Sequence, residues 1–498
     1  MDKKEKIVLA IMTVLAVVLV ILLGMKKINY HCDEIWTYGL SNNQGGINPS
    51  FEVGVEYRGM GPFEAFTTVE DGQGFNYANT WENQAKDVHP PFYYLLIHTV
   101  CSIFKGSYSK WYGIGVNIFW MFFTMYFLYL LLREITGRKI VSFGMLFAVE
   151  TSVIFLDTML LIRMYAQFTF FVILLMYLFK NNWNKKPERQ FLVKLGLTLF
   201  FGMLTHYYFL LIAFFMCLVY GIKMIMSKDS KSIRNYIIAL GVAGLFYGIV
   251  WYHILAHIFN GYRGKEAISK ATSFGGLLSG VSEMLSILNG EAFAGLGGGF
   301  AIAIICYFIV KILRKQTKPS FEFWMFMCGV FYIVVVGKIC PKITTRYIMP
   351  VGWIFIVATF LMIFYVLQQI KTGKVAEYIT IVMFCMLSIF NLSSRGFTVP
   401  MDYIDEKQIA AVEMAEGKEA VVFVDLKWKI LYDFVILQNT KGYLFADKDN
   451  VMNIISDQSE DYILIVNLEE GRESVIQELD YELLYEDGMN YYYKVNVQ

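Results

Sequence analysis

Long apolar runs separated by short polar segments account for most of the chain up to about residue 395. The first run extends from Ile7 to Met25 and follows several lysines, so we interpret it as a retained membrane anchor. An apolar run of about 20 residues is long enough to cross a bilayer as a helix. The pattern predicts eleven transmembrane helices, with the other ten at 111–132, 139–156, 160–179, 191–205, 207–226, 234–255, 300–314, 320–337, 346–368 and 375–391.

One further apolar run, Pro91–Phe104, has only fourteen residues and is too short to cross comfortably. We expect it to form an interfacial or re-entrant helix. Counting it as a span would invert every later loop and place Lys185, Lys186 and Arg189 outside. Because Lys and Arg concentrate in the inner loops of membrane proteins, the eleven-span arrangement is favoured. It puts the N-terminus inside and the C-terminal tail outside.

This topology predicts three outer segments, which are the loop 26–110, the loop 256–299 and the tail 396–498. The tail has the pattern of a soluble α/β domain, in which short β-branched and aromatic runs alternate with helical stretches. Its strands are expected at 421–425, 443–447, 462–467 and 491–496. We therefore expect a transmembrane domain at 1–395 and a small soluble domain at 396–498.

Composition supports this division of the chain. Hydrophobic residues make up 56% and charged residues 17%, which excludes disorder and an ordinary soluble protein. The net charge of +1 conceals an acidic tail, because residues 401–498 hold 21 of the 42 acidic residues but only 8 of the 43 basic ones. The basic residues lie in short loops between apolar runs, so nucleic acid is not an expected partner. The seven scattered cysteines predict neither a disulfide framework nor structural zinc.

Several polar and ionisable residues fall at the predicted outer boundary of the membrane. Ionisable side chains held at that depth are functional candidates. Each also has an ordinary structural explanation, such as a solvated loop, a helix cap, an interhelical hydrogen bond or an arginine that reaches toward lipid headgroups. The candidates are Asp33, Glu34, Asp87, His89, Asp157, Arg163, His206, Tyr207, Lys338, Lys342 and Arg346.

The order of these residues carries a family resemblance. An acidic pair follows the first span, and D-x-HPP-x-YYLL-x-H, R-x-Y-A, LTHY and RY-x-x-P follow it in order along the chain. This series resembles the GT-C glycosyltransferases, most closely the family 39 type. That type includes protein O-mannosyltransferases, aminoarabinose transferases and the RgtA/B/C/D-like group. The resemblance covers roughly residues 1–370 and implies a GT-C-like membrane fold.

The resemblance also implies roles for individual residues. Asp33 matches the catalytic base of the family and Glu34 its partner, while the segment Asp87–His89 matches the loop near the donor phosphate. Arg163 matches the arginine of a stretch usually written Q-E-A-R-x-Y-A. This chain has Leu161 where that stretch has Glu, so the role of the missing carboxylate is lost or passes to Asp157.

The implied reaction is the inverting transfer of a sugar from a polyprenyl phosphate to an acceptor hydroxyl on a glycan, lipid or protein. It needs a carboxylate base and cations that stabilise the leaving phosphate. Arg163, Arg346, Lys338 and Lys342 are the expected cations. A divalent metal ion bridging Asp87, His89 or His206 to phosphate is an open alternative, although the ligand set is weak. The expected location is the plasma membrane.

A lipid-linked sugar flippase or a solute transporter is the competing interpretation. Transporters of this kind usually show repeated halves and polar groups near the midplane of the bilayer. This chain has no evident internal repeat, and its charged candidates gather at one predicted face. The sequence therefore favours a transferase over a transporter.

Overall fold

The computed structural model describes residues 1–316, 318–370, 373–402, 406–467, 475–477, 479–487 and 489–497. The chain divides into two compact units, each built from segments that are far apart in the sequence. The first, here called the helical unit, comprises Met1–Gly24, Asp87–Tyr93 and Ile114–Val399. The second, here called the sheet unit, comprises Met25–Lys86, Tyr94–Gly113 and Pro400–Gln498.

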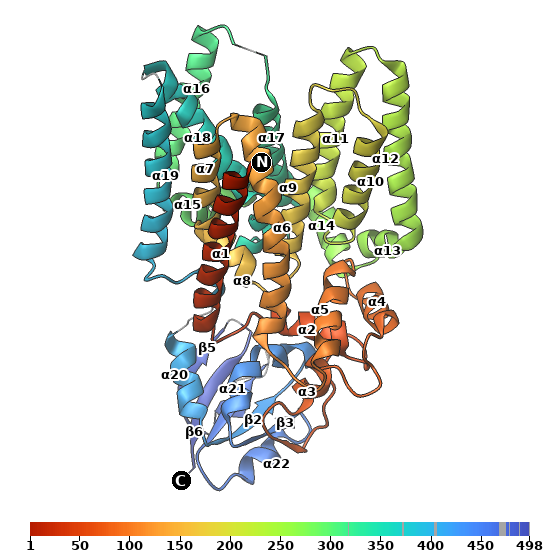
Figure 1. Ribbon diagram of the computed structural model, residues 1–498. Coiled ribbons are helices and arrows are strands. Elements are labelled where there is room, and N and C mark those ends of the chain that lie inside the picture. The colour runs from red at the N-terminus through yellow and green to blue at the C-terminus, as the bar shows by residue number, and fades with distance from the viewer. Residues whose placement is uncertain are drawn as a thin grey trace. The chain divides into compact units, whose positions relative to one another are not determined.

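Most long helices of the helical unit coincide with the predicted apolar runs (Figure 1). The segment 256–299, expected as an outer loop, is instead largely helical, with helices at His253–Phe259, Tyr262–Thr272 and Leu277–Phe293. Seven helices of the described residues are long and apolar enough to cross a membrane, or up to nine if each bent pair is counted as one span. The prediction of a multi-pass helical membrane protein is confirmed, and the count of eleven stays a prediction. The elements are α1 Lys3–Lys26, α6 Lys110–Thr136, α7 Lys139–Glu150, α8 Val153–Leu160, α9 Tyr165–Asn182, α10 Arg189–Met203, α11 Phe209–Met226, α12 Ser230–Val250, α13 His253–Phe259, α14 Tyr262–Thr272, α15 Leu277–Phe293, α16 Gly297–Leu313, α17 Phe321–Ile339, η1 Thr345–Tyr347, α18 Met349–Ile370 and α19 Lys374–Ser394.

Two breaks interrupt this helical pattern. The expected span 139–156 bends by 58° between α7 and α8, where Thr151 Oγ1 donates to the carbonyl of Phe147 and Ser152 Oγ to that of Val149. Side chains that bond to nearby carbonyls compete with the helical pattern and favour such a bend. The second break, of 116°, separates α14 from α15. Gly275 and Gly276 lie in this break with φ of +107° and +72°, values that favour glycine.

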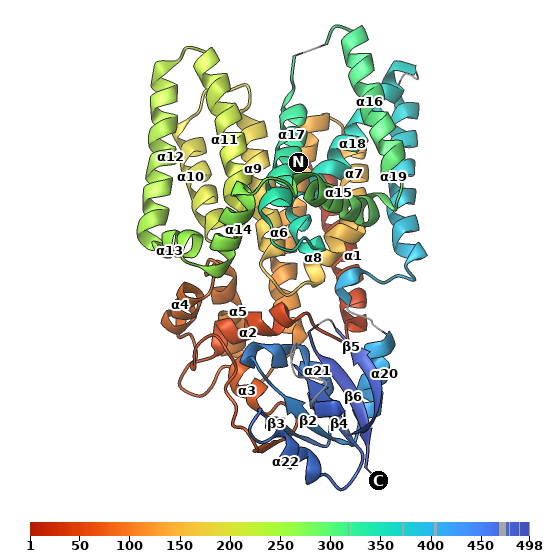
Figure 2. The same cartoon turned by 180° about the vertical axis from the view of Figure 1, so that it is seen from behind.

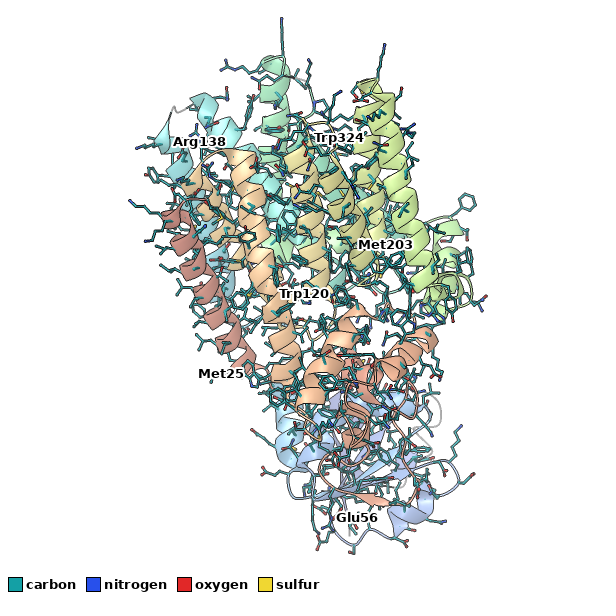
Figure 3. The ribbon with its side chains drawn as sticks, turned by 45° about the vertical axis from the view of Figure 1, so that its right-hand side comes forward. Met25, Glu56, Trp120, Arg138, Met203 and Trp324 are labelled. Atoms are coloured by element: carbon teal, nitrogen blue, oxygen red, sulfur yellow. The ribbon has the colours of Figure 1, made fainter. Side chains whose placement is uncertain are left out.

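α18 lies at the centre of the helical unit. It packs against α7, α8, α9, α16, α17 and α19, and 72% of its most apolar window is buried. Gly352 of α18 lies against the side chain of Ile154, so a larger residue there would clash. In Figure 3 the labelled residues Arg138 and Trp324, near the starts of α7 and α17, lie toward the same end of the helical unit. Met203, at the end of α10, lies farther from that end.

The sheet unit contains a six-stranded mixed sheet in the order β1-β3-β2-β4-β6-β5. Strands β3, β2 and β4 are parallel, and the outer pairings are antiparallel. The four strands predicted in the tail are confirmed, whereas β1 and β5 were not predicted. The elements are α2 Cys32–Asn42, β1 Glu56–Tyr57, α3 Pro62–Thr67, α4 Tyr77–Lys86, α5 Phe92–Ile103, η2 Pro400–Asp402, α20 Glu406–Ala415, β2 Glu419–Phe423, η3 Lys427–Tyr432, α21 Phe434–Asn439, β3 Gly442–Ala446, α22 Val451–Ser456, β4 Tyr462–Val466, β5 Asp480–Glu486 and β6 Tyr491–Asn496.

The change from the helical unit to the sheet unit after Val399 lies close to the expected division at residue 395, but the first outer loop is grouped differently. Most of the first outer loop shares one compact unit with the tail instead of belonging with the transmembrane helices. Cys32, Ile35, Phe63 and Phe66 of the loop pack in one buried cluster with apolar residues of the tail, and β1 pairs with β3. The physical reason is that these buried side chains of α2 and α3 share a core with the tail's apolar residues.

The short apolar run before α6 forms α5, a helix of 12 residues. At about 1.5 Å per residue it extends roughly 18 Å, well short of the ~30 Å hydrocarbon core. It therefore has the length expected of an interfacial or re-entrant helix rather than of a span.

Candidate active site

Three residues from two separated segments of the helical unit form a buried polar cluster. His89 Nδ1 lies 2.8 Å from Asp87 Oδ2, and His89 Nε2 lies 3.4 Å from a terminal nitrogen of Arg163. Arg163 and Asp87 are only 4% and 7% exposed. Since guanidinium can only donate, Nε2 accepts in this arrangement and Nδ1 carries the proton that is donated to Asp87. The cluster unites residues that are 74 positions apart in the chain.

The ionisation states in this cluster follow from its charges. Burial raises the pKa of Asp87, but His89 and Arg163 outweigh burial and hold it below its usual value. Burial lowers the pKa of His206 well below its usual value, and the positive charges of Arg163 and Arg346 act in the same direction. His206 is therefore neutral and stacks on Phe168 at 5.1 Å. The charges near His206 are therefore mainly those of the Asp87 carboxylate and of the guanidinium groups of Arg163 and Arg346.

The backbone before Arg163 is held in place by Asn117 of α6. Asn117 Nδ2 donates to the carbonyl oxygen of Met159, in the last turn of α8, at 3.0 Å and to that of Leu161, directly after α8, at 2.7 Å. Tyr93 in turn donates from its hydroxyl to Asn117 Oδ1 at 2.9 Å. Asn117 was not among the sequence candidates. Its only signal is that it is an amide within a long apolar run.

Tyr207 belongs to a second hydrogen-bonded group that lies beside the turn at His206. Its hydroxyl lies 2.7 Å from His257 Nδ1 and accepts a hydrogen bond from Trp251 Nε1 at 2.9 Å. Trp251 and His257 come from the end of α12 and from α13, and both are buried. Sequence reasoning missed them, since an isolated Trp and His in an apolar stretch carry no pattern.

The structure places Lys338 and Lys342 at the α14–α15 break. Lys338 Nζ donates to the carbonyls of Ser273 and Gly275, both at 2.7 Å. Lys270 makes the reciprocal bonds, to the carbonyls of Cys340 and Pro341. Lys342 lines the same cavity of about 410 Å³. The Lys338 ammonium is therefore engaged in holding the break.

Asp157 is fully buried on α8 and interacts with a second carboxyl group. The carboxyl group of Glu291 on α15 lies near that of Asp157, and its Oε1 lies 3.6 Å from a terminal nitrogen of Arg395. The guanidinium of Arg395 thus supplies a counter-charge to this buried pair. Glu291 and Arg395 were not predicted as partners of Asp157.

Asp33 and Glu34 lie in the sheet unit, at the start of α2. Glu34 accepts hydrogen bonds from Lys27 Nζ at 3.0 Å and from the backbone N–H of His31 at 2.8 Å, and both Lys27 and Glu34 side chains are fully buried. Asp33 is different, because its side chain is 20% exposed and lies 3.7 Å from His31 Nδ1. Glu34 therefore closes the capping box of α2, while Asp33 remains reachable by solvent.

One group within the described residues brings three possible metal ligands together. The ligand atoms of His31, Cys32 and Asp33 lie within 4.8 Å of one another. His31 Nδ1 already accepts a hydrogen bond from the backbone N–H of Asp33, which would have to break for that nitrogen to bind an ion. The alternative set proposed from sequence brings His89 and His206 to a ring separation of 6.3 Å, while His206 Nδ1 accepts from the N–H of Tyr208. A metal ion stays an expectation.

Comparison with known proteins gives two kinds of match. Residues 88–253 match the model of the dolichyl-phosphate-mannose-protein mannosyltransferase family. The fold is similar to that of ArnT from Cupriavidus metallidurans bound to undecaprenyl phosphate, with a TM-score of 0.56, 10% identity and 98% of each chain covered. Apo ArnT gives a TM-score of 0.50 at 10% identity, over 93% of this chain and 96% of that one. No curated protein sequence matches the chain.

The matched segment contains His89, Asp157, Arg163, His206 and Tyr207, so it includes most of the candidates in the helical unit. The structural similarity extends over nearly the whole length of both chains, tail included. The predicted resemblance is thereby confirmed: this is a membrane protein with a GT-C-like fold, similar to the family 39 type of polyprenyl-phosphate-dependent glycosyltransferases.

Proposed function

We propose that the protein is an integral-membrane glycosyltransferase that moves a sugar from a polyprenyl phosphate to an acceptor hydroxyl. The observation that carries the proposal is the buried cluster of Asp87, His89 and Arg163, of which His89 and Arg163 lie in the segment that matches a mannosyltransferase family. The similar fold of ArnT, which was solved with undecaprenyl phosphate, supports a lipid-phosphate donor. The acceptor can be a glycan, a lipid or a protein.

Arg163 binds the phosphate that leaves with the lipid. Its guanidinium is nearly buried, and a cation in a site of low dielectric stabilises developing negative charge strongly. Asp87 and His89 fix its orientation, because the Nδ1–H of His89 donates to Asp87 and leaves Nε2 to accept from Arg163. Arg346, whose charge acts on His206, supplies a second cation to the same region.

Asp33 acts as the base in this proposal. It takes the proton of the acceptor hydroxyl as that oxygen forms a bond to the anomeric carbon. The bond between the anomeric carbon and the phosphate oxygen breaks and polyprenyl phosphate leaves. The configuration at the anomeric carbon is thereby inverted. Asp33 suits this role better than Glu34, because only Asp33 has a partly exposed carboxylate. Glu34 supports the start of α2.

The proposed location is the plasma membrane, with the N-terminus inside and the sheet unit and the reaction outside. The basis is the cluster of Lys185, Lys186 and Arg189 between α9 and α10, which the positive-inside bias places in the cytoplasm. Reporter fusions after residue 185 and after residue 498 should report opposite sides. The same side for both would refute the topology.

The test of the function uses purified protein in nanodiscs with a labelled polyprenyl-phosphate sugar. Release of free polyprenyl phosphate, together with a labelled acceptor, is the expected result, and Arg163→Ala should abolish both. Arg314→Gln, at the exposed end of α16, is a matched control with a lost arginine charge and should turn over normally. Movement of the intact donor across a liposome membrane, without release of polyprenyl phosphate, would instead identify a flippase.

A further inference from the structure

A long groove lies between α10 and α12, and its lining residues do not include those of the candidate active site. The two helices run side by side in the same direction in both views (Figures 1 and 2). Their facing sides enclose a cavity of about 620 Å³, whose walls are almost entirely apolar. That volume lies within the roughly 300–1,000 Å³ typical of sites for small ligands.

Small residues create the hollow. Gly196 of α10 faces Ala243 of α12, and a Cβ added to Gly196 would still be 3.9 Å from the methyl group of Ala243. Ala239 lines the same wall one turn earlier. The rings of Phe200 and Phe246, 4.9 Å apart, meet toward the far end of the groove.

The opposite end of the groove is polar. Arg189 and Asn235 line it there, and Arg189 is the exposed first residue of α10. From Arg189 to Phe200 the helix advances by eleven residues, or about 16 Å at 1.5 Å per residue. This is about half of the ~30 Å hydrocarbon core, which is the depth of one lipid leaflet.

The groove faces the outside of the protein. Only 17% of the most apolar window of α12 is buried, and Val193, Val242 and Phe246 beside the groove are 53%, 61% and 54% exposed. In a multi-pass membrane protein such a surface meets lipid chains. A single cation at one end of an apolar groove of leaflet depth has the charge and shape that complement a phosphate headgroup with its acyl chain.

We propose that this groove is a binding site for an anionic phospholipid, with the phosphate on Arg189 and an acyl chain between α10 and α12. Asn235 donates to the headgroup from the other wall. The chain lies against Gly196 and Ala243 and ends at Phe200 and Phe246. The site does not depend on the proposed glycosyl transfer, and with the expected topology its lipid belongs to the inner leaflet.

The test is native mass spectrometry of the full-length protein after exchange into a mixture of equal amounts of phosphatidylglycerol and phosphatidylcholine. The wild-type protein should retain phosphatidylglycerol in preference to phosphatidylcholine. Arg189→Gln should reduce the preference for phosphatidylglycerol about tenfold, because the variant loses the free energy of a charge-assisted hydrogen bond to the phosphate. Arg314→Gln, which also removes an exposed arginine at a helix end outside the groove, should leave the preference unchanged.

A second variant tests the groove itself. Gly196→Phe fills the hollow with a ring and should remove the retained lipid, while the thermal unfolding temperature shows that the variant is folded. Retention of phosphatidylglycerol by Gly196→Phe, or an unchanged preference in Arg189→Gln, would overturn the proposal. A dimer that wild type forms and that Gly196→Phe abolishes would also overturn it, by identifying a second copy as the occupant.

Discussion

Asn117 Nδ2 donates a hydrogen bond of 2.7 Å to the carbonyl oxygen of Leu161, two residues before Arg163. The same amide group bonds to the carbonyl of Met159, so one side chain satisfies two backbone acceptors where α8 ends. Both carbonyls belong to fully or almost fully buried residues. The position of Arg163 therefore depends on an amide from a different helix.

Asn117→Leu keeps the size of the side chain but removes these hydrogen bonds. We expect the turnover number to fall by about 10²-fold, because a displacement of roughly 1 Å in a group that binds the reacting phosphate has that effect. Steady-state kinetics with a polyprenyl-phosphate sugar measure it. Asn181→Leu, at the far end of α9, is the control and should be near normal. Turnover of Asn117→Leu within twofold of wild type would show that Asn117 does not position Arg163.

Arg163 can be tested by changing its geometry without changing its charge. Arg163→Lys keeps the positive charge but loses the planar fork that binds phosphate through two bonds, so activity should fall at least tenfold. Arg163→Ala should fall further. An arginine that only reaches toward lipid headgroups would be replaced by lysine with little effect. Near-normal release of polyprenyl phosphate by Arg163→Lys would thus remove Arg163 from the proposed mechanism.

Asp33 and Glu34 should respond to substitution in opposite ways. Asp33→Asn should lower turnover by about 10²–10⁴-fold with an unchanged unfolding temperature, because a partly exposed base is lost. Glu34→Gln leaves the buried Lys27 ammonium without its counter-charge, so the free energy of unfolding should fall by about 3–5 kcal/mol. Thermal unfolding and kinetics on both variants separate the two roles. A stable but inactive Glu34→Gln would mean that Glu34 also takes part in catalysis.

Asp433 should make the stability of the sheet unit depend on pH. Burial raises its pKa to about 7, and the nearby Asp487 acts in the same direction, although hydrogen bonds from Asn467, Tyr492 and Asn490 oppose the shift. An unfolded carboxyl has a pKa of about 3.9. The folded form thus binds the proton more tightly, and the stability from this proton is complete below about pH 4 and lost as the pH rises through 7.

The measurement is the unfolding temperature from pH 5 to pH 8, for wild type and for Asp433→Asn. Wild type should lose stability over this range relative to the variant, whose side chain does not titrate. The comparison of slopes removes the contribution of other titrating groups and any constant effect of the substitution. Parallel profiles would show that Asp433 is ionised throughout the range.

Part of this architecture was determined by the sequence alone. Apolar runs of bilayer length predict helices because an unpaired backbone cannot remain in hydrocarbon, and most long helices of the helical unit coincide with those runs. Alternating and β-branched runs in the tail predicted four strands for a similar local reason. The ordered motifs predicted the resemblance that the match over residues 88–253 bears out.

The tertiary structure decided which polar groups meet. No local pattern connects His89 with Arg163 or Asn117 with Leu161, since each pair joins distant segments. Lys338 looked like a cation for phosphate, but the carbonyls of Ser273 and Gly275 surround its ammonium because the α14–α15 break brings them there. The two residues of β1 are too short a signal for any sequence pattern, and only pairing with β3 makes them a strand. Local preference fixes elements, whereas partners far apart in the chain are chosen by packing and by the need to satisfy every buried polar group.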